Sequence, residues 1–260
     1  MATKDTEQEE PTNNKDLLPS TTGLIRESLA TYKKHFRTWL PIYLIFGINA
    51  GLSEIVRDLV QTHLLPDLVG FLLAVIFDAV GIYATVLLIL ALKNKANHIE
   101  LMDNHAISKA WPFFLVSLCY GLMVVFGYLL LIIPGIIVTA WYAFAGVILL
   151  TENLGFKASF AKSKLYVKNH FWRIYRLIAS FIVTLVLAYI VIYLIVGFIG
   201  TSLFHVTGNL PSFYNSMISI IITILIESVI SALVIIYNFQ LYMHVKALPP
   251  VKSPSEKAAK

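Results

Sequence analysis

The stretch from Trp111 to Arg176 decides the fold. It opens with two apolar runs, WPFFLVSLCYGLMVVFGYLLLIIPG (111–135) and IIVTAWYAFAGVILL (136–150), and no charged residue occurs between Trp111 and Leu150. A run of this length is enough for two helices that each cross a bilayer, and Pro134-Gly135 near its middle predicts the turn between them. The segment that follows, FKASFAKSKLYVKNHFWRIYR (156–176), is basic and aromatic. The sequence therefore predicts an integral membrane protein.

The composition supports the same class of protein. Apolar residues make up 58% of the chain and charged residues 13%, against about 45–50% and about 25% in soluble domains. The net charge of +5 comes from cations beside apolar runs, where membrane topology and anionic lipid explain them better than nucleic acid does. Cys119 is the single cysteine, which excludes a disulfide framework and a cysteine-based metal site.

Six apolar spans are expected, so the fold class is all-α: a polytopic membrane protein with interfacial amphipathic helices on its cytoplasmic side. The spans cover about residues 39–60, 67–92, 111–133, 136–151, 177–203 and 217–243. The two polar ends, 1–21 and 247–260, hold too little apolar surface to offset the entropy of ordering and are predicted to be disordered tails. Residues 22–246 then form one six-helix membrane domain.

Amphipathic helices are expected at about residues 24–38, 97–110 and 156–176, where apolar residues recur at helical spacing beside the spans. Lysine and arginine gather in the N-terminal segment, in the connections 93–110 and 151–176, and in the C-terminal tail. The connections after the first, third and fifth spans contain none. This asymmetry predicts cytoplasmic N- and C-termini in a plasma membrane of bacterial type.

An internal repeat is suggested when the chain is shifted by 135 residues. The shift aligns Ser28 with Ser163 and His35 with His170. It also aligns the apolar stripe Ile25, Tyr32, Phe36 and Trp39 with Phe160, Val167, Phe171 and Ile174. With 97–110 as a weaker middle copy, the chain consists of three units, each an amphipathic helix followed by a helical hairpin. The alternative is that any helix next to a membrane selects basic and aromatic residues.

The run from Gly127 to Ile174 resembles the membrane domain of the glycerophosphoryl diester phosphodiesterase membrane-domain family and related bacterial multi-pass proteins. The resemblance rests on the Pro134-Gly135 turn, the acidic connection 152–155, Ser163 and the end 168–172, KNHFW. It is specific over about residues 106–177 and diffuse elsewhere. In the family this domain is fused to a catalytic barrel. Because this sequence has no segment that could encode the barrel, the resemblance does not imply phosphodiesterase activity.

Two acidic residues, Asp78 and Glu227, fall near the middle of the second and sixth spans. An ionised Asp there costs at least about 2.5–3.5 kcal/mol, so such groups are neutral, paired or in contact with water. Glu227 belongs to a polar stripe with Ser231 and Asn238 on one side of a helix. These four residues form a candidate intramembrane polar site. A proton- or cation-linked pathway is one reading, and hydrogen-bonded packing groups are the other.

Two further charged sets are candidate sites. Glu54, Arg57 and Asp58 have helical spacing and predict an ion cluster at the outer rim, with contact to a polar head group or solute as the alternative. The candidate contacts for anionic lipid, or for a cytoplasmic partner protein, are Lys157, Lys162, Lys164, Lys168, Arg173 and Arg176. No pattern of a nucleophilic triad, phosphate loop or dinucleotide-binding turn is present.

We therefore expect a non-enzymatic multi-pass membrane protein that works as a scaffold or accessory protein, with no catalytic, cofactor-binding or metal-binding residues. The alternative is a small-solute or proton-linked transporter or channel that uses Asp78 and Glu227. A scaffold would have a packed interior, whereas a transporter would have a wet cavity that reaches both acids. The expected partners are the lipid bilayer, including anionic head groups, and a membrane or cytoplasmic protein.

Overall fold

The structure is a computed structural model that describes residues 18–95, 103–207 and 212–248. The described residues are helical almost throughout. The helices are α1 (Thr21–Lys34), α2 (Phe36–Gln61), α3 (Asp67–Asn94), α4 (Asn104–Leu130), α5 (Ile132–Tyr142), α6 (Ala145–Glu152), α7 (Phe156–Lys168), α8 (Phe171–Thr207) and α9 (Ser212–Ala247). The all-α fold class is confirmed.

Within the residues that the structure describes, six helical stretches are long and apolar enough to cross a membrane. They are Phe36–Gln61, Asp67–Asn94, Asn104–Leu130, Ile132–Glu152, Phe171–Ile192 and Ile220–Ala247. The prediction of six spans is therefore confirmed. Most boundaries differ from the predicted ones by a few residues. The starts at Phe36, Asn104 and Phe171 lie earlier than predicted, because each helix includes polar residues that precede its apolar part.

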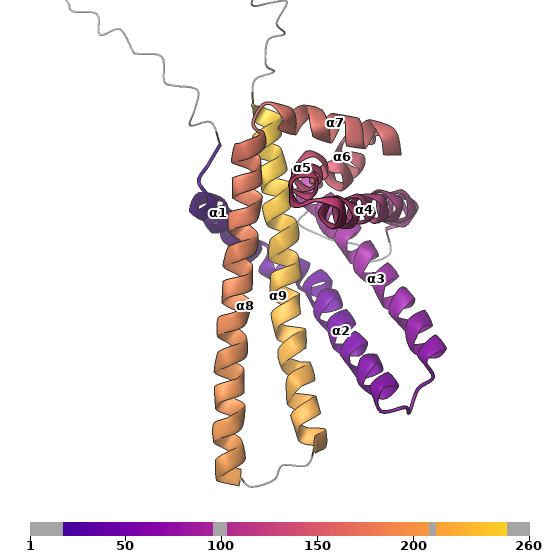
Figure 1. The fold of residues 1–260 in the computed structure, drawn as a ribbon, viewed down its shortest axis with the longest axis vertical. Helices are drawn as coiled ribbons and strands as arrows, with labels where there is room; N and C mark the ends of the chain where they lie inside the picture. Colours follow the sequence, from indigo (N-terminus) through magenta and orange to yellow (C-terminus); the bar gives the residue numbers. More distant parts are fainter. Residues whose placement is uncertain (1–17, 96–102, 208–211, 249–260) are drawn as a thin grey trace, which may run out of the picture.

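Figure 1 shows two long hairpins, α2 with α3 and α8 with α9, that run roughly lengthwise and diverge toward one end. The α4–α5 hairpin runs across their direction, and α7 lies over the opposite end, which we call the α7 end. The core lies toward that end. Both Ala84 to Leu92 of α3 and Ala145 to Leu150 of α6 are buried on nearly every side, as expected of helices that are apolar all round.

Helices α2 and α9 approach each other closely. Gly47 and Gly51 lie on α2 against Ile224 and Ser228 of α9, and a Cβ added to Gly47 would lie 2.3 Å from the backbone oxygen of Ile224. Two glycines four residues apart allow this contact, since small residues let helices pack closely in a membrane. This contact is not among the features predicted from the sequence.

The predicted turn at Pro134-Gly135 is wrong in its position. The chain turns at Leu131, whose φ of −163° and ψ of 151° are extended, and Pro134 and Gly135 lie in the first turn of α5. Proline fits there because the first helical residues need no amide hydrogen for helical bonding. Gly135 instead allows α5 to approach α4, since a Cβ on Gly127 would lie 2.9 Å from the Gly135 Cα.

The predicted amphipathic helices are also corrected. The helix expected at 156–176 ends at Lys168, and a new helix starts at Phe171, so Arg173 and Arg176 belong to α8. Part of the helix expected at 97–110 lies outside the described residues. The remainder, from Asn104, continues without a break into α4, capped by the Asp103 side chain, which accepts a 2.8 Å hydrogen bond from the His105 amide.

The fourth span is broken between Tyr142 and Ala145, which periodicity did not predict. The hydroxyl of Ser163 on α7 covers the break: it donates to the Trp141 carbonyl at 2.8 Å and accepts from the Phe144 amide at 3.3 Å. Backbone groups freed in an apolar region need such partners. The buried Ser163 of α7 therefore supplies the hydrogen bonds that the broken span lacks.

The pattern of burial supports the internal repeat. With the shift of 135 residues, buried positions of α1 and α2 coincide with buried positions of α7 and α8. The buried pairs are Leu24 and Ser159, Ser28 and Ser163, Tyr32 and Val167, Trp39 and Ile174, Ile42 and Leu177, and Phe46 and Phe181. Both helix breaks also coincide, at His35 and at Asn169-His170. The buried face runs through Ser28 rather than through the predicted Ile25 and Phe36, of which Phe36 is exposed.

Candidate functional site

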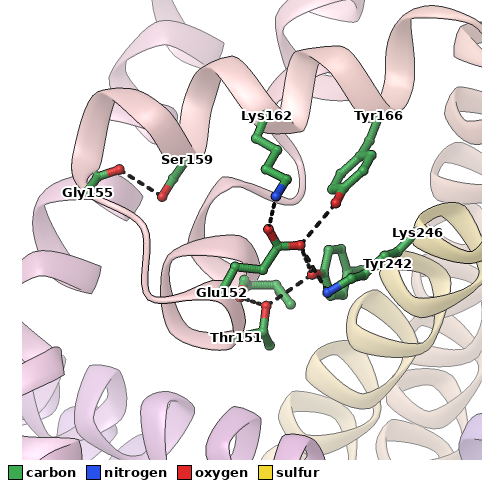
Figure 2. A network of polar contacts seen from close by, with 9 residues as sticks. Thr151, Glu152, Gly155, Ser159, Lys162, Tyr166, Tyr242 and Lys246 are labelled. Carbon is green, nitrogen blue, oxygen red and sulfur yellow. Dashed lines mark hydrogen bonds and ion pairs between the residues drawn. The ribbon is translucent and has the colours of Figure 1, made fainter. Parts of the chain in front are cut away.

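The α7 end of the molecule contains the largest network of charged and polar side chains in the described chain, centred on Glu152. Helix α6 ends at this residue because Asn153 takes a left-handed conformation with φ of 53°, which asparagine tolerates better than most residues. The chain then starts α7 at Phe156. Figure 2 shows the Glu152 carboxylate pointing between α7 and α9.

Four side chains donate to the Glu152 carboxylate. Oε1 accepts hydrogen bonds from the Tyr242 hydroxyl at 2.7 Å and the Tyr166 hydroxyl at 3.0 Å, and it lies 3.1 Å from the Lys246 Nζ. Oε2 forms an ion pair with Lys162. The Glu152 side chain is only 9% exposed, whereas the two lysine side chains are 38% and 43% exposed. A buried carboxylate with this many donors is fully satisfied.

The electrostatics of the network stabilise its charged form. The hydrogen bond to Glu152 raises the pKa of Lys162 above its ordinary value, although partial burial opposes the shift. Burial raises the pKa of Tyr166, and its hydrogen bond to Glu152 adds to this, so the phenol remains a donor. No group of three or more His, Cys, Asp or Glu suited to a metal ion occurs in the described chain. The network therefore works as a clamp that joins α6, α7 and α9.

Most of this network is not predicted by the sequence. The sequence places Glu152 in a connection and Lys162 among the lipid contacts, and it indicates no role for Tyr166, Tyr242 or Lys246. A signal was available, because both α7 and α9 carry a tyrosine and a lysine four residues apart, which places the pair on one side of a helix. Nothing in one sequence indicates, however, that the two pairs face the same acid.

The predicted basic surface of α7 is divided by the structure. Lys162 is held by Glu152, and Arg173 donates to the Leu18 carbonyl. Lys164 lies over the Trp141 ring, 4.2 Å from its centroid. The residues left on the exposed surface with no ion pair in the described chain are Lys157, Lys164, Lys168 and Arg176. On the other side of α7, Ser159, Ser163 and Val167 are buried.

The candidate intramembrane site is not one site in the structure. Asp78 is exposed on α3, and no hydrogen bond or ion pair of its side chain occurs within the described residues. Glu227 is half-buried on α9 and accepts a 3.0 Å hydrogen bond from Ser231, four residues along the same helix. Asn238 lies two turns further on and lines a separate cavity. Asp78, Glu227 and Ser231 do not line that cavity.

The candidate rim cluster is partly formed. Arg57 forms an ion pair with Glu54 one turn earlier in α2, and the Arg57 side chain is 63% exposed. Asp58 is exposed and forms no ion pair within the described chain. An exposed pair of this kind contributes roughly 0–1 kcal/mol, so the structure assigns this cluster no more than a surface contact between Glu54 and Arg57.

Comparison with known proteins gives two bacterial relatives. One, from Pectobacterium carotovorum, is 29% identical over 210 residues that cover 77% of this chain and 76% of the relative. The other, from Photorhabdus laumondii, is 26% identical over 210 residues, which cover 79% and 75%. Both are named UPF0259 membrane proteins. The chain is similar to these membrane proteins.

The likeness to UPF0259 membrane proteins agrees with the six spans, and their names state no activity. No family model matches the chain, and no solved structure matches it. The resemblance to the glycerophosphoryl diester phosphodiesterase membrane-domain family therefore gains no support from the comparisons. What they support is the broader class of bacterial multi-pass membrane proteins.

Proposed function

We propose that the protein is a non-enzymatic membrane scaffold, in which a six-span bundle holds α7 at one membrane surface. The observation that carries the proposal is the Glu152 network. In this network a buried carboxylate, two lysines and two tyrosines fix the position of α7 against α6 and α9. An amphipathic helix that only had to lie on lipid would need no such clamp.

The positions of Asp78 and Glu227 weigh against the transporter alternative. A pathway built on both acids requires a wet space that reaches them. Asp78 is exposed on the outside of α3, and Glu227 bonds to Ser231 of its own helix. The cavity near Asn238 has no ionisable carboxylate among its lining residues. This arrangement favours the scaffold.

A flux measurement tests this choice. The full chain would be reconstituted into liposomes, and the decay of a pH gradient would be followed with a dye inside them. We expect the same decay as in empty liposomes, with no change for Glu227→Gln or Asp78→Asn. A decay faster than in empty liposomes that either substitution abolishes would overturn the scaffold proposal in favour of proton-linked transport.

We infer further that the exposed face of α7 binds anionic lipid head groups. Lys157 and Lys168 extend from α7 with no ion pair in the described chain, and Arg176 is exposed on the first turns of α8. Trp172 between them is 69% exposed, and tryptophan favours the interface between water and hydrocarbon. Each exposed cation contributes on the order of 1 kcal/mol near an anionic leaflet.

Spin-labelled lipids measure this preference on the whole protein. We expect phosphatidylglycerol to be enriched next to the protein over phosphatidylcholine, and the triple substitution of Lys157, Lys168 and Arg176 to glutamine to remove most of the enrichment. The matched control is Arg57→Gln, which removes an exposed cation at the opposite end of the bundle. Equal enrichment in the triple variant and the control would exclude the lipid site.

We also propose that both termini are cytoplasmic and that the host membrane is the plasma membrane. The described ends support one common side, because Leu18 bonds to Arg173 at the start of α8 and Leu248 follows the Lys246 of the Glu152 network. The lysine and arginine distribution supports the cytoplasmic side. Fusions of alkaline phosphatase and of a fluorescent protein to the C-terminus test it: fluorescence without phosphatase activity is expected, and the reverse would refute it.

A further inference from the structure

A cavity of about 170 Å³ lies between α3, α4, the break that separates α5 from α6, and α9. Most of its wall is apolar, with Ile89, Phe113, Val147 and Val234 among the lining side chains. The polar side chains at the cavity are those of Thr85, Ser117, Tyr120, Tyr142 and Asn238. It is separate from the Glu152 network and from α7, none of whose residues line it.

The hydrogen bonds of the lining groups show which of them are available. Thr85 donates its hydroxyl hydrogen to the Gly81 carbonyl at 2.9 Å, and Tyr120 donates to the Thr139 carbonyl at 3.2 Å. Both hydroxyls can then only accept. Asn238 differs, because its Oδ1 is buried and accepts no hydrogen bond within the described chain. The Asn238 side-chain amide carries both donors and an acceptor, and a buried acceptor without a partner costs free energy.

The break in the fourth span helps to make this space. Ala143 lies in the break and Gly146 in the first turn of α6, and both line the cavity, Ala143 with only a methyl group and Gly146 with no side chain. A Cβ on Gly146 would lie 2.8 Å from the Phe113 ring, so glycine there keeps the ring in place at the cavity wall. A straight helix with larger residues would fill the volume. Since Ser163 of α7 supports the break, the empty space is built into the fold.

We propose that this cavity is a binding site for a small uncharged molecule with an aromatic or compact apolar body and one hydroxyl group. The size fits, since an apolar cavity of about 150 Å³ in another protein holds benzene. The ligand is uncharged because no charged side chain lies among the described lining residues, and an unpaired ion in such a wall is strongly disfavoured. Its hydroxyl bonds to the Asn238 amide, which otherwise remains incompletely paired.

The probe for this site is 4-fluorophenol, with 4-fluorotoluene as the analogue that lacks the hydroxyl. Both would be titrated into full-length protein in lipid nanodiscs, and the fluorine NMR signal would be compared with that in empty nanodiscs to subtract partition into lipid. We expect saturable one-to-one binding of 4-fluorophenol to the native chain. Only non-saturating partition, equal to that in empty nanodiscs, would overturn the proposal.

Two variants locate the site. Ala143→Leu fills part of the cavity and should weaken both probes by roughly ten-fold or more, whereas the matched control Ala79→Leu makes the same change on the exposed side of α3 and should leave both unchanged. Asn238→Leu removes the amide and should weaken 4-fluorophenol by roughly ten-fold but not 4-fluorotoluene.

If Ala143→Leu does not fold, the ratio of the affinities for the two probes in Asn238→Leu still tests the proposal. An unchanged ratio in Asn238→Leu would overturn the role of the amide, and unchanged binding in a folded Ala143→Leu would overturn the location. The outcome is independent of the scaffold proposal, because neither lipid enrichment at α7 nor ion flux depends on this cavity.

Discussion

Replacing Glu152 with glutamine should release α7 from the bundle. The substitution keeps the size of the side chain but removes the charge that Lys162 and Lys246 share. Removing one partner of a buried ion pair costs about 3–5 kcal/mol. Here both lysine side chains are more than a third exposed and regain water when the pair is lost. We therefore expect a loss of about 2–3 kcal/mol in the free energy of unfolding.

The measurement is reversible unfolding in mixed micelles titrated with dodecyl sulfate and followed by circular dichroism. The matched control is Glu54→Gln, which breaks the exposed pair with Arg57 and should cost less than about 1 kcal/mol. Hydrogen exchange gives the local result. The amides of α7 should exchange faster in Glu152→Gln, while those of the α2 and α9 contact at Gly47 should not.

The reasoning would be refuted if Glu152→Gln cost no more than Glu54→Gln, or if the α7 amides kept their protection. Either result would mean that the buried serine face of α7 holds the helix without the ion network. Faster exchange spread evenly over all helices would also count against a clamp, since a clamp acts on the segment that it holds.

Three other substitutions have expected outcomes. Gly47→Ala should lower the free energy of unfolding by more than about 2 kcal/mol, because the new Cβ would lie 2.0 Å from the Ser228 hydroxyl and 2.3 Å from the Ile224 backbone oxygen. The control is Gly121→Ala, where the added Cβ meets open space. It should be neutral or stabilise the protein by up to about 1 kcal/mol. Ser163→Ala should cost about 1–3 kcal/mol by exposing the break between α5 and α6; full stability would contradict that role. Burial, and then the charge of Lys34, lowers the pKa of His35. The free energy of unfolding should therefore fall as the pH drops from above about 6.5. In His35→Gln the part of this fall that His35 causes should be absent, and a pH profile identical to that of the native chain would refute the prediction.

The number of spans could be predicted from sequence because it depends on long apolar runs, and bilayer thickness makes their length decisive. The helix breaks could not be predicted as well. Pro134 marked a turn in the sequence, yet proline is also stable in a first helical turn, where it lies in α5. The break at 143–144 has no proline or glycine at either position; it depends on a serine from another helix, and no local pattern reports such a contact.

The candidate sites were harder to predict than the fold. Charge alone grouped Lys162 with Lys157 as lipid contacts, although the structure pairs only Lys162 with an acid. Helical spacing placed Glu227 and Asn238 on one side of α9, and the structure separates them, because the neighbours of α9 change along its length. Helix α2 packs on it near Ile224 and Ser228, whereas near Asn238 it lines a cavity together with α3, α4 and α6. A stripe on one helix is therefore not a site until its neighbours are known.

The shift of 135 residues aligns two helices, α1 and α7, that each dock through a buried serine. Helix α7 follows the α4–α6 unit and docks on it through Ser163. The residue of α1 that aligns with Ser163, Ser28, donates instead to Gln240 of α9 at 2.5 Å, and the Gln240 amide donates to Thr31 at 2.8 Å. The first amphipathic helix thus docks on the last span, and contacts between the two ends of the chain close the bundle. Because Ser28 and Gln240 are 212 residues apart in sequence, this contact can form only after α9 has been made, whereas the elements joined by Ser163 lie within 22 residues. The two aligned helices therefore both dock through a buried serine hydroxyl but over very different separations in sequence, and the more local contact is expected to form first.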